Sequence, residues 1–144
     1  GGLATVLHGY ARMTADVDLV IDLEQTEAEK AVHTLLGLGL KSRLPVDPMQ
    51  FAQADTRTTW INEKHMLVFS FYDPANPLHI VDLFVREPFP FKEMAARADI
   101  VNIDGVRIPV CAIPDLIELK RRAARPRDID DIAHLQELLR QRDE

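Results

Sequence analysis

The sequence is poor in cysteine and contains no long hydrophobic run. Its one cysteine, Cys111, excludes an internal disulfide, and a free thiol predicts a reducing compartment, the cytoplasm. No stretch approaches the roughly 18 consecutive apolar residues that a membrane-spanning helix needs. No basic residue leads an apolar segment at the start, as it would in a signal peptide. These absences predict a cytoplasmic protein that has no membrane contact.

An excess of positive charge is also missing. The chain has 17 Lys and Arg residues against 23 Asp and Glu residues, and its formal net charge is −6. Nucleic-acid binding through overall basicity is therefore excluded, although a local basic patch is not. Apolar residues at 47% and charged residues at 28% are typical of a folded protein and exclude a disordered chain.

The length of 144 residues suits a single domain, and we predict one domain over residues 1–144, built around one core. The chain begins on Gly1 without a methionine, which predicts that residues preceding Gly1 belong to the whole protein.

Periodicity and turn residues predict an α/β (α+β) fold, in which helices cover a mixed, partly antiparallel sheet. One helix is expected between a capping box of Thr26 and Glu29 and a stop at Gly37. Residues 41–64 give no clear pattern, apart from a candidate short strand at 58–61. The other expected strands are 16–22, 66–72, 78–85, 99–103 and 106–110, and the other expected helices are 3–8, 114–124 and 126–140.

The sharpest motif is Asp16-Val17-Asp18. In a strand, residues two apart project from the same face, so both carboxylates point to one spot about 6 to 7 Å apart along the backbone. Two such carboxylates repel each other unless a cation lies between them, and hard oxygen ligands suit Mg²⁺. The alternative is a solvated strand face.

A third carboxylate, Asp82, lies within the apolar segment 80–85. Burying it there costs several kcal/mol unless a partner compensates the charge. Two explanations remain open. Asp82 shares a metal ion with Asp16 and Asp18, or it forms a salt bridge to Arg86 or to a distant Lys.

The order of these motifs resembles the DNA polymerase beta-like nucleotidyltransferase superfamily, and more narrowly the AbiEii-type toxin nucleotidyltransferases. Gly1-Gly2 stands before a helix, and a third Asp stands on a later strand. Gly2 occupies a position where many superfamily members have Ser. The remaining motifs that carry the resemblance are Arg12-x-Thr14-x-Asp16-x-Asp18, Asp115-Leu116-Ile117-x-x-Lys120 and Arg127-Asp128-x-x-Asp131.

The resemblance implies a nucleotidyltransferase-like fold and the transfer of an NMP from an NTP to a hydroxyl group. It implies that Asp16, Asp18 and Asp82 are catalytic and hold two Mg²⁺ ions, and that Asp82 also accepts or orients the proton of the attacking hydroxyl. Lys120 would neutralise triphosphate charge as a further catalytic residue. The implied nucleotide-binding residues are Gly1, Gly2, Arg12, Thr14, Lys120 and Asp128. For Arg127, Asp128 and Asp131, ordinary charge in the first turn of a helix stays an alternative.

The resemblance also favours RNA, such as the tRNA 3′ end, as the acceptor in a toxin–antitoxin setting with a cognate antitoxin. Relatives in the wider superfamily modify proteins or antibiotics, so these acceptors remain alternatives. A non-catalytic protein on the same fold, binding a nucleotide or a partner, is the rival from another class. A metal-dependent phosphodiesterase is disfavoured because the sequence shows no set of His ligands.

Overall fold

The computed structural model describes residues 1–144, which form two compact units. Unit 2 is the continuous segment 15–91, whereas unit 1 combines residues 1–14 with residues 92–144. Each unit has its own cluster of buried apolar side chains. The chain length, by contrast, predicts a single core. The single domain stays a prediction, because two compact units can belong to one domain.

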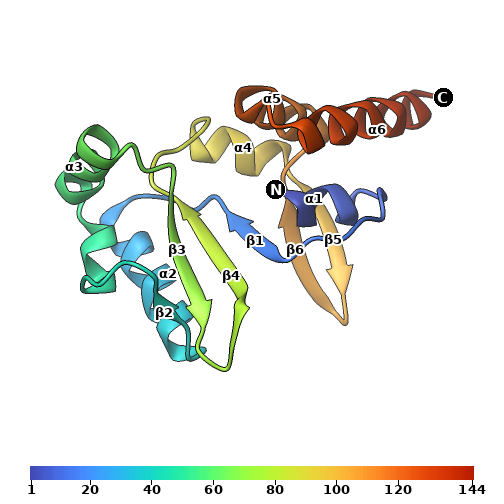
Figure 1. Ribbon diagram of the computed structural model, residues 1–144. Coiled ribbons are helices and arrows are strands. Elements are labelled where there is room, and N and C mark those ends of the chain that lie inside the picture. Colours follow the sequence, from blue (N-terminus) through green and yellow to red (C-terminus); the bar gives the residue numbers. More distant parts are fainter. The chain divides into compact units, whose positions relative to one another are not determined.

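Unit 2 is built on a four-stranded mixed sheet in the order β1-β4-β3-β2 (Figure 1). Strand β1 is parallel to β4, whereas β3 is antiparallel to both β4 and β2. Together with the helices and a separate hairpin, this sheet confirms the predicted α+β class. The elements of unit 2 are β1 (Asp16–Leu19), α2 (Gln25–Gly37), β2 (Lys41–Ser42), the 3₁₀ helix η1 (Pro48–Ala52), α3 (Ala54–Lys64), β3 (Val68–Asp73) and β4 (Asn76–Phe84).

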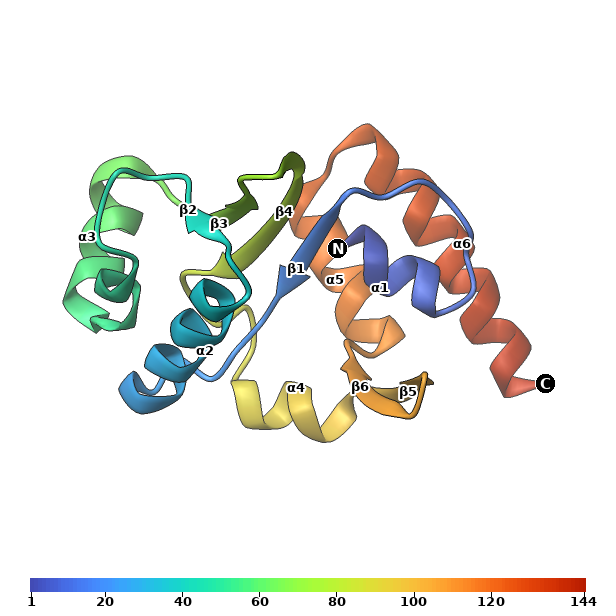
Figure 2. The same cartoon turned by 90° about the horizontal axis from the view of Figure 1, so that it is seen from below.

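One face of this sheet carries the core of unit 2. Phe69, Phe71 and Leu83 are fully buried, and Phe69 stacks on Phe51 and Trp60 with ring centroids 5.5 and 5.0 Å away. Helix α2 joins the same cluster and lies along the sheet (Figure 2). Because side chains alternate along a strand, the residues between these core positions project from the opposite face.

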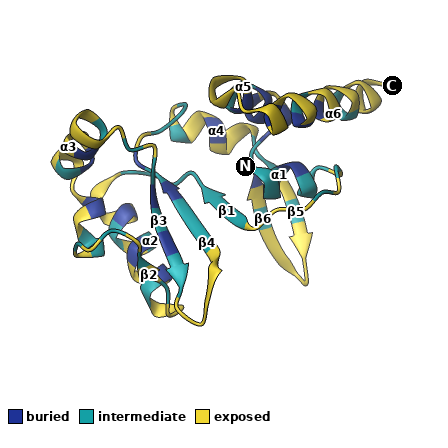
Figure 3. Ribbon diagram, viewed as in Figure 1, coloured by how far each residue is buried: buried dark blue, intermediate teal, exposed yellow.

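Unit 1 consists of four helices and a two-stranded hairpin. Its buried cluster consists of Ile113, Leu116, Ile117 and Leu135, and Ala4 of the first helix packs against them. The turn end of the hairpin is exposed (Figure 3). The elements are α1 (Gly2–Leu7), α4 (Phe91–Arg97), whose first residue closes unit 2, β5 (Asp99–Ile103), β6 (Val106–Val110), α5 (Ile113–Ala123) and α6 (Pro126–Asp143). None of the helices combines the length and the apolar composition needed to cross a bilayer.

Two predicted boundaries near β1 are wrong. The strand ends at Leu19 rather than Asp22, because Asp22 already belongs to the turn before α2 and accepts a hydrogen bond from the Glu24 N–H. Helix α2 then begins one residue before Thr26. Its N-terminal cap is the Glu24 carboxylate, which accepts from the Glu27 N–H at 3.1 Å, and not a capping box.

The candidate strand at 58–61 is also wrong, since these residues belong to α3. Arg57 and Trp60 are three residues apart, so helical geometry buries both on one face of α3. Trp60 packs into the core of unit 2 there, which stabilises the helix. The hydroxyl of Thr58 donates to the carbonyl of Ala54 at 3.1 Å, so this β-branched residue is accommodated within the helix. The other predicted elements are confirmed, with small shifts at their ends.

Candidate active site

The strand register of unit 2 brings the predicted carboxylates together. Strand β1 pairs with β4 so that Asp18 lies opposite Asp82, and Asp16 lies two residues before Asp18. In β3, Ser70 is the residue opposite Asp82. These residues alternate with the core positions Phe69, Phe71 and Leu83, so they project from the face of the sheet that does not carry the core of unit 2.

Asp82 has an electrostatically unfavourable environment. Burial raises the pKa of Asp82, and the negative charges of Asp18 and Asp16 and a hydrogen bond with Asp18 raise it further. One contact opposes these effects, because the Ser70 hydroxyl donates to Oδ1 of Asp82 at 2.5 Å and lowers the pKa. No ion pair joins Asp82 to Arg86 or to a lysine. The salt-bridge explanation of this half-buried carboxylate is therefore wrong.

The chemistry of this group fits a hard divalent cation. All three charged side chains are carboxylates, and each would gain from a positive charge because each contributes to the repulsion at Asp82. The structure does not gather three or more acidic, His or Cys side chains into a ready-made metal site. The assignment of Asp16, Asp18 and Asp82 as metal ligands thus stays a prediction.

The raised pKa gives a stability prediction. Between the ordinary pKa of an aspartate and the raised pKa of Asp82, the folded state holds a proton that the unfolded state has lost, so this group makes folding less favourable as pH rises through that window. Asp82→Asn removes the charge and keeps an oxygen for Ser70. Without metal, at about pH 7, the variant should melt at a higher temperature than the wild type, and the gain should vanish below about pH 4.

Thermal melts in EDTA across that pH range would check this expectation. Asp55→Asn is the matched control, because Asp55 is an exposed carboxylate of the same unit on α3. A melting temperature that falls at neutral pH in Asp82→Asn alone would show that Asp82 stabilises the fold instead.

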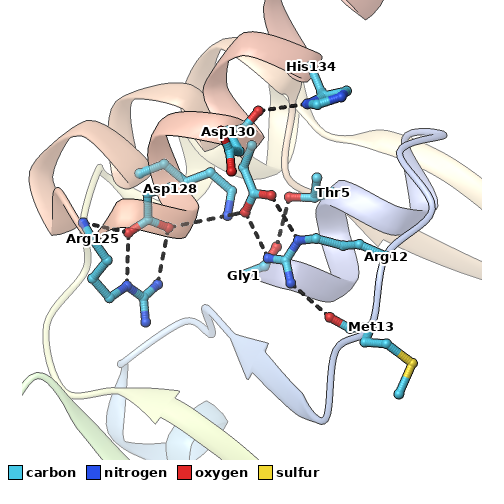
Figure 4. A network of polar contacts seen from close by, with 10 residues as sticks. Gly1, Thr5, Arg12, Met13, Arg125, Asp128, Asp130 and His134 are labelled. Atoms are coloured by element: carbon cyan, nitrogen blue, oxygen red, sulfur yellow. Dashed lines mark hydrogen bonds and ion pairs between the residues drawn. The ribbon is translucent and has the colours of Figure 1, made fainter.

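The late motif of the sequence forms a buried ionic network in unit 1 (Figure 4). The ammonium group of Lys120, whose side chain is 4% exposed, donates to Oδ2 of Asp131 at 2.7 Å and lies 3.7 Å from Oδ1 of Asp128. Arg12 makes a bidentate pair with Asp131, with N···O distances of 2.8 and 2.7 Å. Arg125 holds Asp128 through its side chain and its backbone N–H. Ordinary surface charge is therefore the wrong interpretation of Asp128 and Asp131, which are 0% and 1% exposed, whereas Arg127 is exposed as that interpretation predicts.

The surroundings of both acids in this network lower the pKa and so favour the ionised form. Burial alone would raise the pKa of Asp128, but hydrogen bonds from Arg125 and the charges of Arg125 and Lys120 outweigh it and lower the pKa. Burial opposes ionisation of Asp131 in the same way, and hydrogen bonds from Arg12 and Lys120 again lower the pKa below the ordinary value. Each buried charge in the network is thus compensated by an opposite charge.

The glycine pair has a packing role in unit 1. A Cβ atom on Gly2 would lie 2.6 Å from Oγ1 of Thr14 and 2.8 Å from Nη2 of Arg12, which is closer than side chains tolerate. The carbonyl of Gly1 accepts from the backbone N–H and from the hydroxyl of the buried Thr5, both at 3.3 Å. A Ser at position 2 would therefore require the side chains of Thr14 and Arg12 to move.

The predicted site residues therefore form two groups. Asp16, Asp18 and Asp82 lie in unit 2, whereas Gly1, Gly2, Arg12, Thr14, Lys120 and Asp128 lie in unit 1. The structure adds Ser70 and Asp131, which the sequence analysis did not include among the site residues. Ser70 could have been found as the one polar residue between Phe69 and Phe71, at the strand position facing Asp82.

Comparison with the sequence profiles of known families identifies the family of this chain. The sequence profile described as "Nucleotidyl transferase AbiEii toxin, Type IV TA system", where TA stands for toxin–antitoxin, matches residues 1–143. No curated protein matches the sequence. The matched range includes every residue of both groups.

Proposed function

Because this chain belongs to the AbiEii family of nucleotidyltransferase toxins, whose activity is nucleotidyl transfer in a toxin–antitoxin system, we propose that it is a Mg²⁺-dependent enzyme that transfers an NMP from an NTP to a hydroxyl of RNA. The observation that carries the proposal is the register of β1 and β4, which sets Asp18 directly beside Asp82 in a chain of this family. We further propose a cytoplasmic location and a cognate antitoxin as partner.

In this proposal Asp16, Asp18 and Asp82 hold two Mg²⁺ ions. The ions supply positive charge that binds the triphosphate and offsets charge developing on its oxygens. The acceptor oxygen forms a bond to the α-phosphorus, the bond from that phosphorus to the bridging oxygen breaks, and pyrophosphate leaves. Asp82 accepts the hydroxyl proton.

The network of unit 1 supplies the nucleotide-binding part of the proposal. Lys120 would act here through its positive charge, because its ammonium group already donates to Asp131 and its side chain is only 4% exposed. Asp128 and Asp131 fix the position of the ammonium group. Asp131 holds Arg12, and Thr14 lies beside Gly2 at the start of α1. In this proposal Gly1 and Gly2 lie next to the phosphate.

The proposal is tested by incubating the protein with each α-labelled NTP, Mg²⁺ and total bacterial RNA. Label should appear on RNA with at least one NTP and should be absent when EDTA replaces Mg²⁺. Label on the protein itself would identify a protein acceptor. An absence of label together with no stabilisation by Mg²⁺ and NTP would favour a non-catalytic protein, since a ligand at about 100 times its Kd should add about 2.7 kcal/mol to the stability.

A further inference from the structure

Unit 2 contains a pocket that takes no part in the proposed transfer. Its volume is about 430 Å³, within the range of small-molecule sites. One face of α3, the segment before α2 and the chain just after β4 form its walls. The lining residues are Leu23, Ala54, Arg57, Thr58, Ile61, Asn62, Val85, Arg86 and Glu87.

The pocket includes a buried arginine that has no carboxylate partner. The side chain of Arg57 belongs to a residue only 7% exposed, and its guanidinium lies 5.6 Å from the ring centroid of Phe51. Nη1 donates to the carbonyl of Phe51 at 2.7 Å and Nη2 to the carbonyl of Leu23 at 3.3 Å. Burial lowers the pKa of Arg57, and no acidic group offsets that effect. This buried positive charge therefore lacks a compensating anion.

Arg57 retains hydrogen-bonding capacity toward the pocket. A guanidinium has five N–H donors, and the two carbonyl contacts leave Nε without a partner. Since no buried side-chain nitrogen or oxygen of the protein lacks a partner, Nε is accessible rather than sealed in the core. The neighbouring lining residues add further donors, because Asn62 carries an amide and Arg86 is exposed without an ion pair.

The walls of the pocket also include apolar side chains. Leu23, Ile61 and Val85 provide apolar surface, and Glu87 is the single acid among the lining residues, against two arginines. We propose that this pocket binds a small phosphate monoester, with its phosphate on Arg57, Arg86 and Asn62 and its apolar body on Leu23, Ile61 and Val85. Guanidinium groups match phosphate in charge and geometry, and the bound anion would compensate Arg57.

The test uses phenyl phosphate as the probe, with calorimetry in EDTA and without NTP, so that its result does not depend on nucleotidyl transfer. The wild type should bind phenyl phosphate, and inorganic phosphate should bind more weakly because it lacks an apolar body. Phenol should not bind. If inorganic phosphate binds as strongly as phenyl phosphate, the proposed contact between the apolar body of the ligand and the apolar side chains of the pocket is wrong.

Arg86→Glu should weaken binding of phenyl phosphate by about tenfold or more, because it places a negative charge where the phosphate is received. Arg43→Glu is the matched control, an exposed arginine of unit 2 that does not line the pocket, and its binding should equal that of the wild type. Arg57→Lys, which keeps the charge but loses the guanidinium geometry, should also weaken binding. The proposal is overturned if the folded wild type does not bind the probe, or if Arg86→Glu binds it as the wild type does.

Discussion

Asp18→Asn is expected to lower the rate of nucleotidyl transfer by about 10²- to 10³-fold or more, because a metal ion stabilises transition-state charge by several kcal/mol and about 1.4 kcal/mol corresponds to a factor of ten. The substitution removes one negative charge with little change in volume. Asp18 lies directly beside Asp82 in the sheet, so its charge acts at the centre of the carboxylate group. Asp16→Asn should have the same effect. Label transfer from the α-labelled NTP measures both.

Asp55→Asn again serves as the control, since it removes an exposed carboxylate of the same unit and should leave the transfer rate unchanged. Circular dichroism should show that all three variants are folded. Undiminished transfer by folded Asp16→Asn and Asp18→Asn would rule out metal binding by this pair, and with it the proposed mechanism.

Asp131→Ala is expected to lower the free energy of unfolding by about 3 to 5 kcal/mol, the usual effect of breaking a buried ion pair by removing one partner. Lys120 would stay buried with Asp128 as its nearest acid, at 3.7 Å, and Arg12 would lose both hydrogen bonds to a side chain. Urea denaturation at neutral pH measures the loss. Asp130→Ala should change the stability by less than about 0.5 kcal/mol, because Asp130 is the exposed neighbour on the same helix.

The same contribution should depend on pH. The pKa of Asp131 is lowered in the folded state, so its stabilising effect is complete above the ordinary aspartate pKa of about 4 and disappears as pH falls through the lowered value. The stability difference between Asp131→Ala and the wild type should therefore shrink in acid. A difference that stays constant down to about pH 2 would show that Asp131 acts through packing rather than charge.

Local sequence patterns were sufficient where local geometry decides the structure. Asp104 and Gly105 both adopt positive φ, at 50° and 81°, as a two-residue hairpin turn requires, and the hairpin of β5 and β6 has the predicted bounds. The period-2 spacing of Asp16 and Asp18 likewise predicted a strand. Both signals concern residues that lie close together in the sequence.

Helix α3 is an element that local sequence patterns do not predict. Residues 58–61 include β-branched and aromatic side chains, which favour a strand by propensity. The helix instead satisfies contacts that lie far away in the sequence, because Trp60 stacks on Phe69 and Arg57 reaches the carbonyl of Leu23. A pattern within one short window contains no information on these partners.

The candidate site shows the same division. The motif order identified Lys120 and Asp128, but only the fold shows that the ammonium group is buried between two acids. The pairing of Arg12 with Asp131 spans 119 positions of the chain, and no spacing rule links them. The sequence motif therefore contains Asp131 but gives no sign that this acid joins Arg12 to Lys120.

The discontinuous composition of unit 1 has a consequence for the order in which the protein folds. Unit 2 is continuous and can form its core as soon as residues 15–91 have left the ribosome. Unit 1 cannot form until residues 92–144 have been synthesised, because residues 1–14 pack against them. The association of these two segments also closes a long loop, which costs entropy. Until α6 emerges, Arg12 has no Asp131 to bind, so residues 1–14 are synthesised before unit 2 but reach their native contacts after it.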